Sequence, residues 1–320
     1  MRRRTPSGNY KKQLMTPKQD TLICVVGPTA IGKTKLAIEL AKAFNTEIVS
    51  ADSRQFYKEM TIGTAVPSAE ELQAVPHHFI QNKTIYEPYS VGDFETEALE
   101  KLYELFKINN TVVMVGGSGL YVDAVTKGLD YFPNVSEELR EQLNAQLNEE
   151  GLESLQKELE QKDPSYYKKV DLQNPHRVIR ALGVIRTSGK PYSSFLNQEK
   201  KERPFKTIYV GLTADRETVY ARINKRVDLM MEAGLLSEAK TLMPYKDLNA
   251  LNTVGYRELF DYLGGRFTLQ EALSEIKKNT RRFAKRQLTW FKKNKAIHWF
   301  DYRTPAKEII HGLKTKNALQ

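Results

Sequence analysis

Short runs of apolar residues recur along this chain at the length of buried β-strands. LICVV (22–26) is followed by EIVS (47–50), TVVMV (111–115) and TIYVGL (207–212). Such runs, bounded by glycine or polar residues, are typical of short buried strands. LAIELAKAF, after the first run, has the apolar spacing of a helix. The pattern predicts an α/β fold in which helices flank a parallel sheet.

A different pattern occupies residues 131–200. SEELREQLNAQLNEE begins at Ser136, a good N-cap, and Gly151 separates it from LESLQKELEQKD. NPHRVIRALGVIRTSGKP also has helical spacing and ends at Gly189. We therefore expect residues 131–200 to form a small all-helical insertion domain. The core would then comprise residues 20–130 and 201–320, and residues 1–19 would be a basic flexible tail.

GPTAIGKT (27–34) joins the first strand to the first helix. In a loop of the form G-x-x-x-x-G-K-T, consecutive backbone N–H groups and the helix N-terminus bind phosphate oxygens. Lys33 would reach the outer phosphates, and the Thr34 hydroxyl would hold Mg²⁺. The loop predicts a site for a di- or triphosphate, formed by Gly27, Pro28, Thr29, Ala30, Ile31, Gly32, Lys33 and Thr34.

Two charged features near this loop have two interpretations each. Asp52 follows the second strand, where a carboxylate could meet the ligand of the loop, but aspartate is equally common as a turn or capping residue. Arg222 and Arg226 share a helix face, which is either solvated or in contact with the phosphates. No aspartate ends the strand TVVMV, so the Walker B carboxylate of the usual P-loop ATPase is not evident there.

The chain carries a formal net charge of +10, and part of this charge is clustered. Residues 277–295 contain nine lysines and arginines, and no acidic residue occurs from 276 through 300. On a helical projection, basic residues share one face and apolar residues lie opposite. The basic residues are Lys278, Arg281, Arg282, Lys285 and Arg286, and the apolar ones are Ile276, Phe283, Trp290 and Phe291. We interpret the basic face as a contact to a nucleic-acid backbone, and we expect Phe283 and Phe291 to face the core.

Two classes of enzyme fit these features. One is a P-loop kinase that uses ATP to phosphorylate a small molecule, and the other uses a small diphosphate to modify a nucleic acid. The kinase is disfavoured because the strand-end aspartate is missing and the basic helix stays unexplained. A GTPase would need an N-K-x-D motif, which is absent. The single cysteine, Cys24, and the lack of a membrane-length apolar run predict a cytoplasmic protein, which we expect to be a monomer.

Seven motifs together point to one family. They are GPTAIGKT, ADSRQFYKEMTIGTAVPSAEE, PHH, GGSGLY, PHRVIRALGV, VGYRE and AKRQLTWFK, in this order. From about residue 20 to residue 300, the chain resembles the bacterial tRNA dimethylallyltransferase (isopentenyl-diphosphate–tRNA transferase) family. The resemblance implies a P-loop NTPase-like core. It also implies transfer of a dimethylallyl group from dimethylallyl diphosphate to the exocyclic amine of adenosine 37, just 3′ of the tRNA anticodon. The partners would be the tRNA anticodon stem–loop and the diphosphate donor, with no membrane.

The resemblance also implies roles for individual residues. Asp52 would be the general base, and Thr29 would hydrogen-bond near the bridging oxygen of the donor. The glycine-rich loop and Arg222 would bind the diphosphate, with Mg²⁺ held through Thr34. Ile31 and Ser118 replace a serine and a threonine frequent in the family, with little consequence, because the backbone N–H and the hydroxyl remain. Contacts to tRNA would be made by Asp52, Ser53, Arg54, Gln55, Ser118, Arg140, His176, Arg177, Val178, Ile179, Arg180, Arg257, Arg281, Arg282, Lys285 and Arg286.

Overall fold

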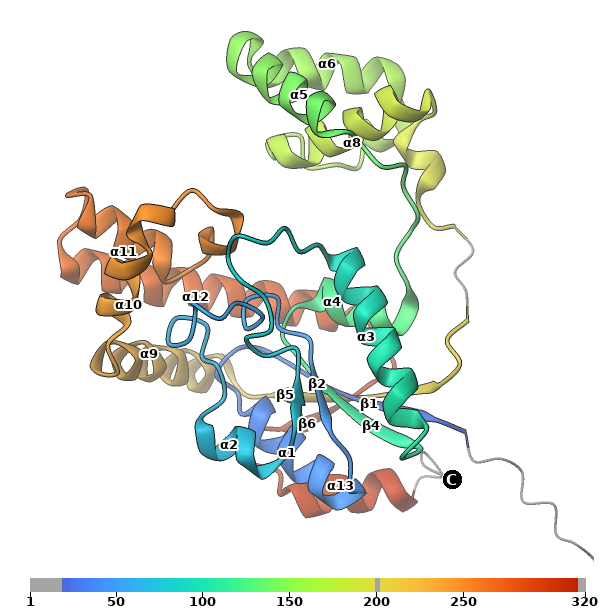
Figure 1. The fold of residues 1–320 in the computed structure, drawn as a ribbon, viewed down its shortest axis with the longest axis vertical. Coiled ribbons are helices and arrows are strands. Elements are labelled where there is room, and N and C mark those ends of the chain that lie inside the picture. The colour runs from blue at the N-terminus through green and yellow to red at the C-terminus, as the bar shows by residue number, and fades with distance from the viewer. Residues whose placement is uncertain (1–18, 199–201, 316–320) are drawn as a thin grey trace, which may run out of the picture. The chain divides into compact units, whose positions relative to one another are not determined.

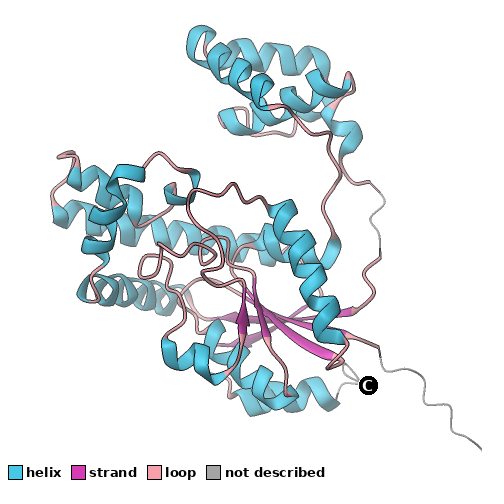
Figure 2. Cartoon of the chain, in the orientation of Figure 1, coloured by secondary structure: helices cyan, strands magenta, loops and turns pink. Residues whose placement is uncertain are grey.

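The computed structural model describes residues 19–198 and 202–315, so residues 1–18 of the expected basic tail lie outside the described residues. Its centre is a six-stranded sheet in the order β3-β2-β4-β1-β5-β6 (Figure 1 and Figure 2). Every neighbouring pair of strands is parallel, which confirms the predicted parallel sheet. The strands are β1 (Thr21–Val26), β2 (Ile48–Ser50), β3 (His77–His78), β4 (Thr111–Val115), β5 (Lys206–Thr213) and β6 (Ile297–Asp301).

Alternating residues of β1 enter two separate apolar cores, one on each face of the sheet. Ile23 and Val25 pack with α1 and α13, whereas Leu22 and Cys24 pack with α3 and α4. Successive side chains of a strand point to opposite faces, so a strand covered on both faces is apolar throughout. Figure 1 shows α1 and α13 on one side of the sheet and α3 and α4 on the other. These helices are α1 (Lys33–Phe44), α3 (Val91–Phe106), α4 (Gly119–Lys127) and α13 (Ala306–Thr315).

A third apolar core lies among helices α9 to α12. Tyr256 is fully buried there, and its hydroxyl donates to Glu238 Oε1 (2.6 Å). The same carboxylate accepts backbone N–H groups of three consecutive residues, 61–63. Glu238 therefore holds the loop 60–66, which lines the site described below. The elements of this region are α2 (Ala69–Ala74), α9 (Arg216–Glu232), α10 (Leu235–Leu242), η2 (Met243–Tyr245), η3 (Asn249–Leu251), α11 (Tyr256–Leu263) and α12 (Leu269–Phe291).

Helix α12 is the longest of the described helices, with 23 residues. It begins with a capping box in which Thr268 and Glu271 exchange side-chain to backbone hydrogen bonds. It ends at Phe291, so the last three lysines of the basic stretch lie beyond the helix. In the described ranges no helix, α12 included, is long and apolar enough to cross a membrane.

Residues 127–202 form a second compact unit. The helices of its described part surround an apolar core of their own, which includes Leu143 and Leu182. As predicted, the Ser136 hydroxyl caps the first helix by accepting a backbone N–H (3.3 Å), and the last long helix ends at Gly189, which adopts a φ of 69°. The elements are α5 (Glu137–Glu150), α6 (Leu152–Lys162), α7 (Pro164–Tyr167), α8 (Pro175–Ser188) and η1 (Tyr192–Phe195).

Candidate active site

The glycine-rich loop connects β1 to α1 and lines a cavity, which we call the loop chamber. Residues 29–35 form one wall, and residues 64–68 with Asp52 form another. Lys33 begins α1, and its Nζ donates to the Pro28 carbonyl (2.8 Å). Burial lowers the pKa of Lys33 to about 8, although the Asp52 carboxylate acts in the opposite direction. A buried ammonium beside a helix N-terminus favours the binding of a polyanion.

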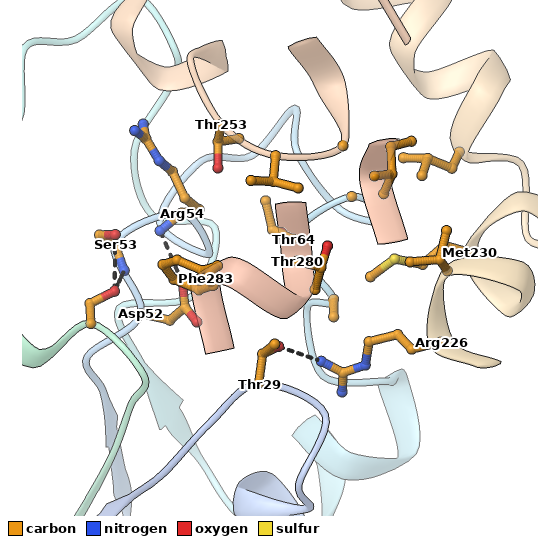
Figure 3. A pocket seen from close by; sticks show the side chains of 18 residues that line it. Thr29, Asp52, Ser53, Arg54, Thr64, Arg226, Met230, Thr253, Thr280 and Phe283 are labelled. Carbon is orange, nitrogen blue, oxygen red and sulfur yellow. Dashed lines mark hydrogen bonds between the residues drawn. The ribbon is translucent and has the colours of Figure 1, made fainter. Parts of the chain in front are cut away.

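A second cavity, which we call the apolar chamber, adjoins the loop chamber (Figure 3). Its apolar lining side chains come from three helices and the loop before α11; they are Val227, Met230, Leu235, Val254, Ile276 and Phe283. The residues that line both chambers are Thr29, Asp52, Thr64, Ala65 and Arg226. Figure 3 shows Asp52 on one side of Thr29 and Arg226 on the other. A ligand that extends through both chambers would therefore pass these three polar side chains.

Asp52 lies two residues beyond β2, at the carboxyl end of the sheet. Its Oδ1 accepts the Arg54 N–H (3.2 Å), so Asp52 forms a turn and also lines both chambers. Burial raises the pKa of the Asp52 carboxyl, although the Arg54 N–H and the charges of Lys33, Arg54 and Arg226 oppose this shift. A carboxylate with a raised pKa in a cavity is suited to accept a proton near neutral pH.

The two arginines of α9 lie on different sides of the glycine-rich loop. Arg226 lines both chambers, and its Nη1 donates to Thr29 Oγ1 (3.3 Å; Figure 3). Arg222, the expected ligand of the diphosphate, is exposed: its Nε donates to the Ala30 carbonyl (2.7 Å), and its guanidinium lies over the Tyr302 ring. The two arginines share a face of α9 but lie about 6 Å apart along its axis. Arg226 therefore reaches the boundary of the chambers, whereas Arg222 does not.

The polar residues after β2 bind neighbouring loops of the protein. The Ser53 N–H donates to the Ser118 hydroxyl (3.1 Å), and the two hydroxyls lie 3.0 Å apart. The Arg54 guanidinium donates to three backbone carbonyls in and after η3, and Gln55 Nε2 donates to two carbonyls of the loop 60–66. These bonds place Ser53, Ser118 and Arg54 at the apolar chamber and Gln55 at the loop chamber.

The basic residues of α12 have different surroundings. Three are exposed, namely Arg282, Lys285 and Arg286. Lys278 instead pairs with Glu275 (2.7 Å), an acid just outside the acid-free stretch. Arg281 is half-buried and donates to Asn224 Oδ1 on α9 (2.9 Å). The face available for phosphates is therefore narrower than the sequence suggested, because Glu275 of the same helix neutralises the charge of Lys278 and the Arg281 guanidinium binds α9.

The expectation that Phe283 faces the core is wrong. Phe283 is 38% exposed and lines the apolar chamber, and Trp290 is 39% exposed, whereas Ile276 and Phe291 are buried. The physical reason is that α12 runs past the apolar chamber, so part of its apolar face borders a cavity instead of packed side chains. An aromatic ring in this position offers a surface on which a nucleic-acid base can stack.

The remaining residues expected to contact tRNA are not among the residues that line the two chambers. Arg140, His176, Arg177 and Arg180 are exposed on α5 and α8 of the second unit, and Arg257 is exposed on α11. Within the second unit the Val178 side chain is fully buried and Ile179 packs against the same core. A contact from Val178 would therefore have to be made by its backbone.

Besides Phe283, two residues of the site were not assigned to it from the sequence: Arg226, whose role the sequence left open, and Gln287. Gln287 is 5% exposed, and it lies in the middle of the apolar face of α12. A polar residue inside an apolar helical stripe is a signal that could have revealed it. A Cβ on Gly117 would overlap Gln287 Nε2, and one on Gly119 would overlap the Trp290 ring. The glycine run after β4 therefore allows α12 to approach closely.

Among the described residues, no group of three or more His, Cys, Asp or Glu side chains is arranged to hold a metal ion. Mg²⁺ needs no such group when phosphate oxygens and waters supply most of its ligands. The Thr34 hydroxyl lines the loop chamber, where a phosphate would lie. This hydroxyl fits Mg²⁺ bound together with a diphosphate, whose oxygens and waters would supply the other ligands.

Known proteins resemble this chain over most of its length. A profile of the IPP transferase family matches residues 55–294. The tRNA dimethylallyltransferase of Christiangramia forsetii is 59% identical over 295 residues, which cover 92% of this chain and 98% of that protein. The crystal structure of the full-length tRNA isopentenylpyrophosphate transferase of Bacillus halodurans is 39% identical, with a TM-score of 0.69, and the match covers 94% of this chain and 96% of that one. A eukaryotic dimethylallyltransferase, seen in crystals acting on tRNA, is 25% identical with a TM-score of 0.77 over 93% of this chain and 77% of that one. These likenesses confirm the P-loop NTPase-like core.

Proposed function

The chain belongs to the IPP transferase family, and on this premise we propose that it transfers a dimethylallyl group from dimethylallyl diphosphate to tRNA. The acceptor is the exocyclic amine of adenosine 37, and pyrophosphate is released. The observation that carries this proposal is the position of Thr29 and Asp52 at the boundary between the two chambers. The loop chamber suits a diphosphate, and the apolar chamber suits a flipped adenine and a prenyl chain.

The chemistry follows from the side chains at this boundary. The adenine amine is a weak nucleophile, because its lone pair is delocalised into the ring. Asp52 accepts a proton from the amine while the nitrogen bonds to C1 of the dimethylallyl group, and the C1–oxygen bond breaks. The electron pair of that bond leaves with pyrophosphate, whose charge Lys33 and Arg226 neutralise. Because Arg226 donates to Thr29 Oγ1, the Thr29 hydroxyl can direct its proton at the bridging oxygen.

Mg²⁺ held at Thr34 together with the diphosphate would add positive charge at the leaving group.

The proposed tRNA contacts are described separately for each of the two units. On α12 the exposed basic residues bind phosphates, and Phe283 stacks on the flipped base. In the second unit Arg140, Arg177 and Arg180 are exposed, and they too bind phosphates of the tRNA.

The choice of donor gives the first test. With Mg²⁺ and unmodified tRNA, label from dimethylallyl diphosphate should reach RNA, whereas label from the γ-phosphate of ATP should reach neither RNA nor a small metabolite. The matched control is an anticodon stem–loop with guanosine in place of adenosine 37, which lacks the N6 amine and should stay unlabelled. Robust phosphate transfer from ATP would instead favour the small-molecule kinase, which the relatives named above do not support.

A second prediction concerns the pH dependence of donor binding. The pKa of Lys33 is about 8 in the free protein, and the negative charge of a bound diphosphate raises it. Affinity should therefore be independent of the Lys33 proton below pH 8 and fall as pH rises through 8, by up to about tenfold per pH unit until the pKa of the bound state is reached.

Isothermal titration calorimetry with dimethylallyl diphosphate and Mg²⁺ measures this fall. Lys33→Arg is the matched variant, because an arginine keeps its charge well above pH 8. The ratio of the two affinities cancels the titration of the ligand itself. Parallel affinity curves for the two proteins would show that the Lys33 proton does not control donor binding.

A further inference from the structure

A single buried amide connects three segments of the chain at the site. Gln287 lies on α12, and its Oε1 accepts the backbone N–H of Thr29 (2.8 Å). Its Nε2 donates to the Gly117 carbonyl (2.9 Å) in the loop after β4. Glutamine is one of the few side chains that can accept one backbone bond and donate another at the same time. The side chain is 5% exposed, and its bond to the Gly117 carbonyl is buried, whereas its bond to Thr29 lies at the edge of the cavities.

The two loops that Gln287 joins lead to Thr29, which is proposed to hydrogen-bond to the donor, and to Asp52, which is proposed to accept the proton of the acceptor amine. On one side is Thr29 itself, whose hydroxyl accepts from Arg226 at the chamber boundary. On the other side, Gly117 precedes Ser118, and the Ser118 hydroxyl accepts the Ser53 N–H (3.1 Å) directly after Asp52. Gln287 therefore connects the loop of Thr29 with the segment that carries Asp52.

The bond to Thr29 also has a consequence within the glycine-rich loop. In such loops the backbone N–H groups normally point at phosphate oxygens. The Thr29 N–H instead points at Gln287, so the hydroxyl is the hydrogen-bond donor that Thr29 keeps for a ligand. The Thr29 backbone is thus oriented by α12, while the other N–H groups of the loop stay available for the diphosphate.

We propose that Gln287 is a positioning residue that sets the placement of the Thr29 hydroxyl relative to the Asp52 carboxylate. The inference deepens the proposed function and rests on it, since Thr29 and Asp52 matter only if transfer occurs between them. A displacement of reacting groups by about 1 Å can cost about 10²-fold in rate. Loss of the Gln287 amide leaves the Thr29 N–H and the Gly117 carbonyl without this partner, so both loops can shift.

The test uses Gln287→Ala and Gln287→Glu in the full chain, with wild-type protein beside them. Glutamate keeps the acceptor for Thr29 but cannot donate to the Gly117 carbonyl. At saturating dimethylallyl diphosphate and tRNA, the single-turnover transfer rate should fall by about 10- to 100-fold in both variants. The dissociation constants of donor and tRNA should stay within about threefold of the wild-type values in Gln287→Ala, because the other loop N–H groups and the exposed basic residues are unchanged. In Gln287→Glu the added negative charge beside the glycine-rich loop weakens donor binding, so the transfer rate of this variant is compared only at saturating donor.

Asn109→Ala is the matched control. Asn109 also joins backbone segments through its amide, donating to the carbonyls of Phe44 and Asn45 and accepting the Thr111 N–H, but it lies at the opposite end of β4 from the site. It should lower the melting temperature as the Gln287 variants do and leave the transfer rate unchanged.

Each outcome decides the proposal. Wild-type rates at saturation in folded Gln287 variants would overturn it, and so would losses confined to donor or tRNA affinity. If Gln287→Ala does not fold, the near-isosteric Gln287→Glu provides the same comparison. Failure of the wild-type protein to transfer any dimethylallyl group would reject the proposed function itself, which separates the two failures.

Discussion

Replacing Asp52 with asparagine should slow single-turnover transfer of the dimethylallyl group by roughly 10²–10⁴-fold. The substitution keeps the shape of the side chain, and Oδ1 can still accept the Arg54 N–H. It removes the carboxylate that would accept the amine proton. Affinity for dimethylallyl diphosphate should not fall, because a negative charge next to the loop chamber is lost. Rapid-quench measurement of labelled tRNA gives the rate.

The pH dependence of the wild-type rate supplies a second readout. Only the carboxylate form of Asp52 accepts a proton, so the rate should fall as pH falls through its pKa. Burial raises the pKa of this group, so the midpoint should lie above the ordinary aspartate value of about 3.9, and Asp52→Asn should lack this limb.

The matched control is Asp215→Asn, the same substitution at an aspartate that caps α9 by accepting the Thr218 N–H (2.7 Å). Asparagine is an equally good cap, so both stability and rate should hold. If Asp52→Asn behaves like this control, Asp52 is only a turn residue.

Replacing the three exposed basic residues of α12 with glutamine should weaken tRNA binding by on the order of 100-fold at about 0.1 M salt. The estimate follows from counterion release, because each lost phosphate contact removes about 0.7 to 0.9 from the slope of log affinity against log salt concentration. Three contacts therefore remove roughly 2 to 3 from the slope. Filter binding across a salt series measures both quantities. The residues are Arg282, Lys285 and Arg286.

Thermal stability and donor affinity should barely change in this triple variant, since exposed substitutions rarely alter stability by more than about 0.5 kcal/mol. A control variant removes the same number of charges elsewhere on the unit that carries α12, through the exposed Lys42, Lys107 and Lys307. If the two variants bind tRNA with equal affinity and equal salt slope, the basic face of α12 is merely solvated, and the net charge needs another explanation.

Local features of this protein were readable from the sequence because they depend on neighbouring residues. The apolar run 22–26 had to be a buried strand, since its alternating side chains enter cores on both faces of the sheet. The glycine-rich loop was identified by its spacing and flanks, and Ser136 capped its helix as predicted. In each case the residues of one short stretch of chain are enough to determine the local structure.

Placement of single side chains at the site depended on how distant elements pack. The sequence put Arg222 and Arg226 on one face of α9, but only the packing of α9 against the glycine-rich loop decides which guanidinium reaches Thr29. Phe291 of the apolar stripe on α12 is buried as expected, but Phe283 of the same stripe is not, because a cavity rather than a core lies against that part of α12.

Gln287 shows most clearly that the sequence does not specify which distant groups a side chain contacts. The sequence alone determined that a polar residue stands inside the apolar face of a long helix. Its partners, Thr29 and Gly117, are 258 and 170 residues away along the chain. A buried amide must find a donor and an acceptor, but the sequence pattern does not specify which loops supply them. The tertiary structure decides this, because the backbone groups of the two loops meet the side chain of Gln287 only when the sheet and α12 are packed.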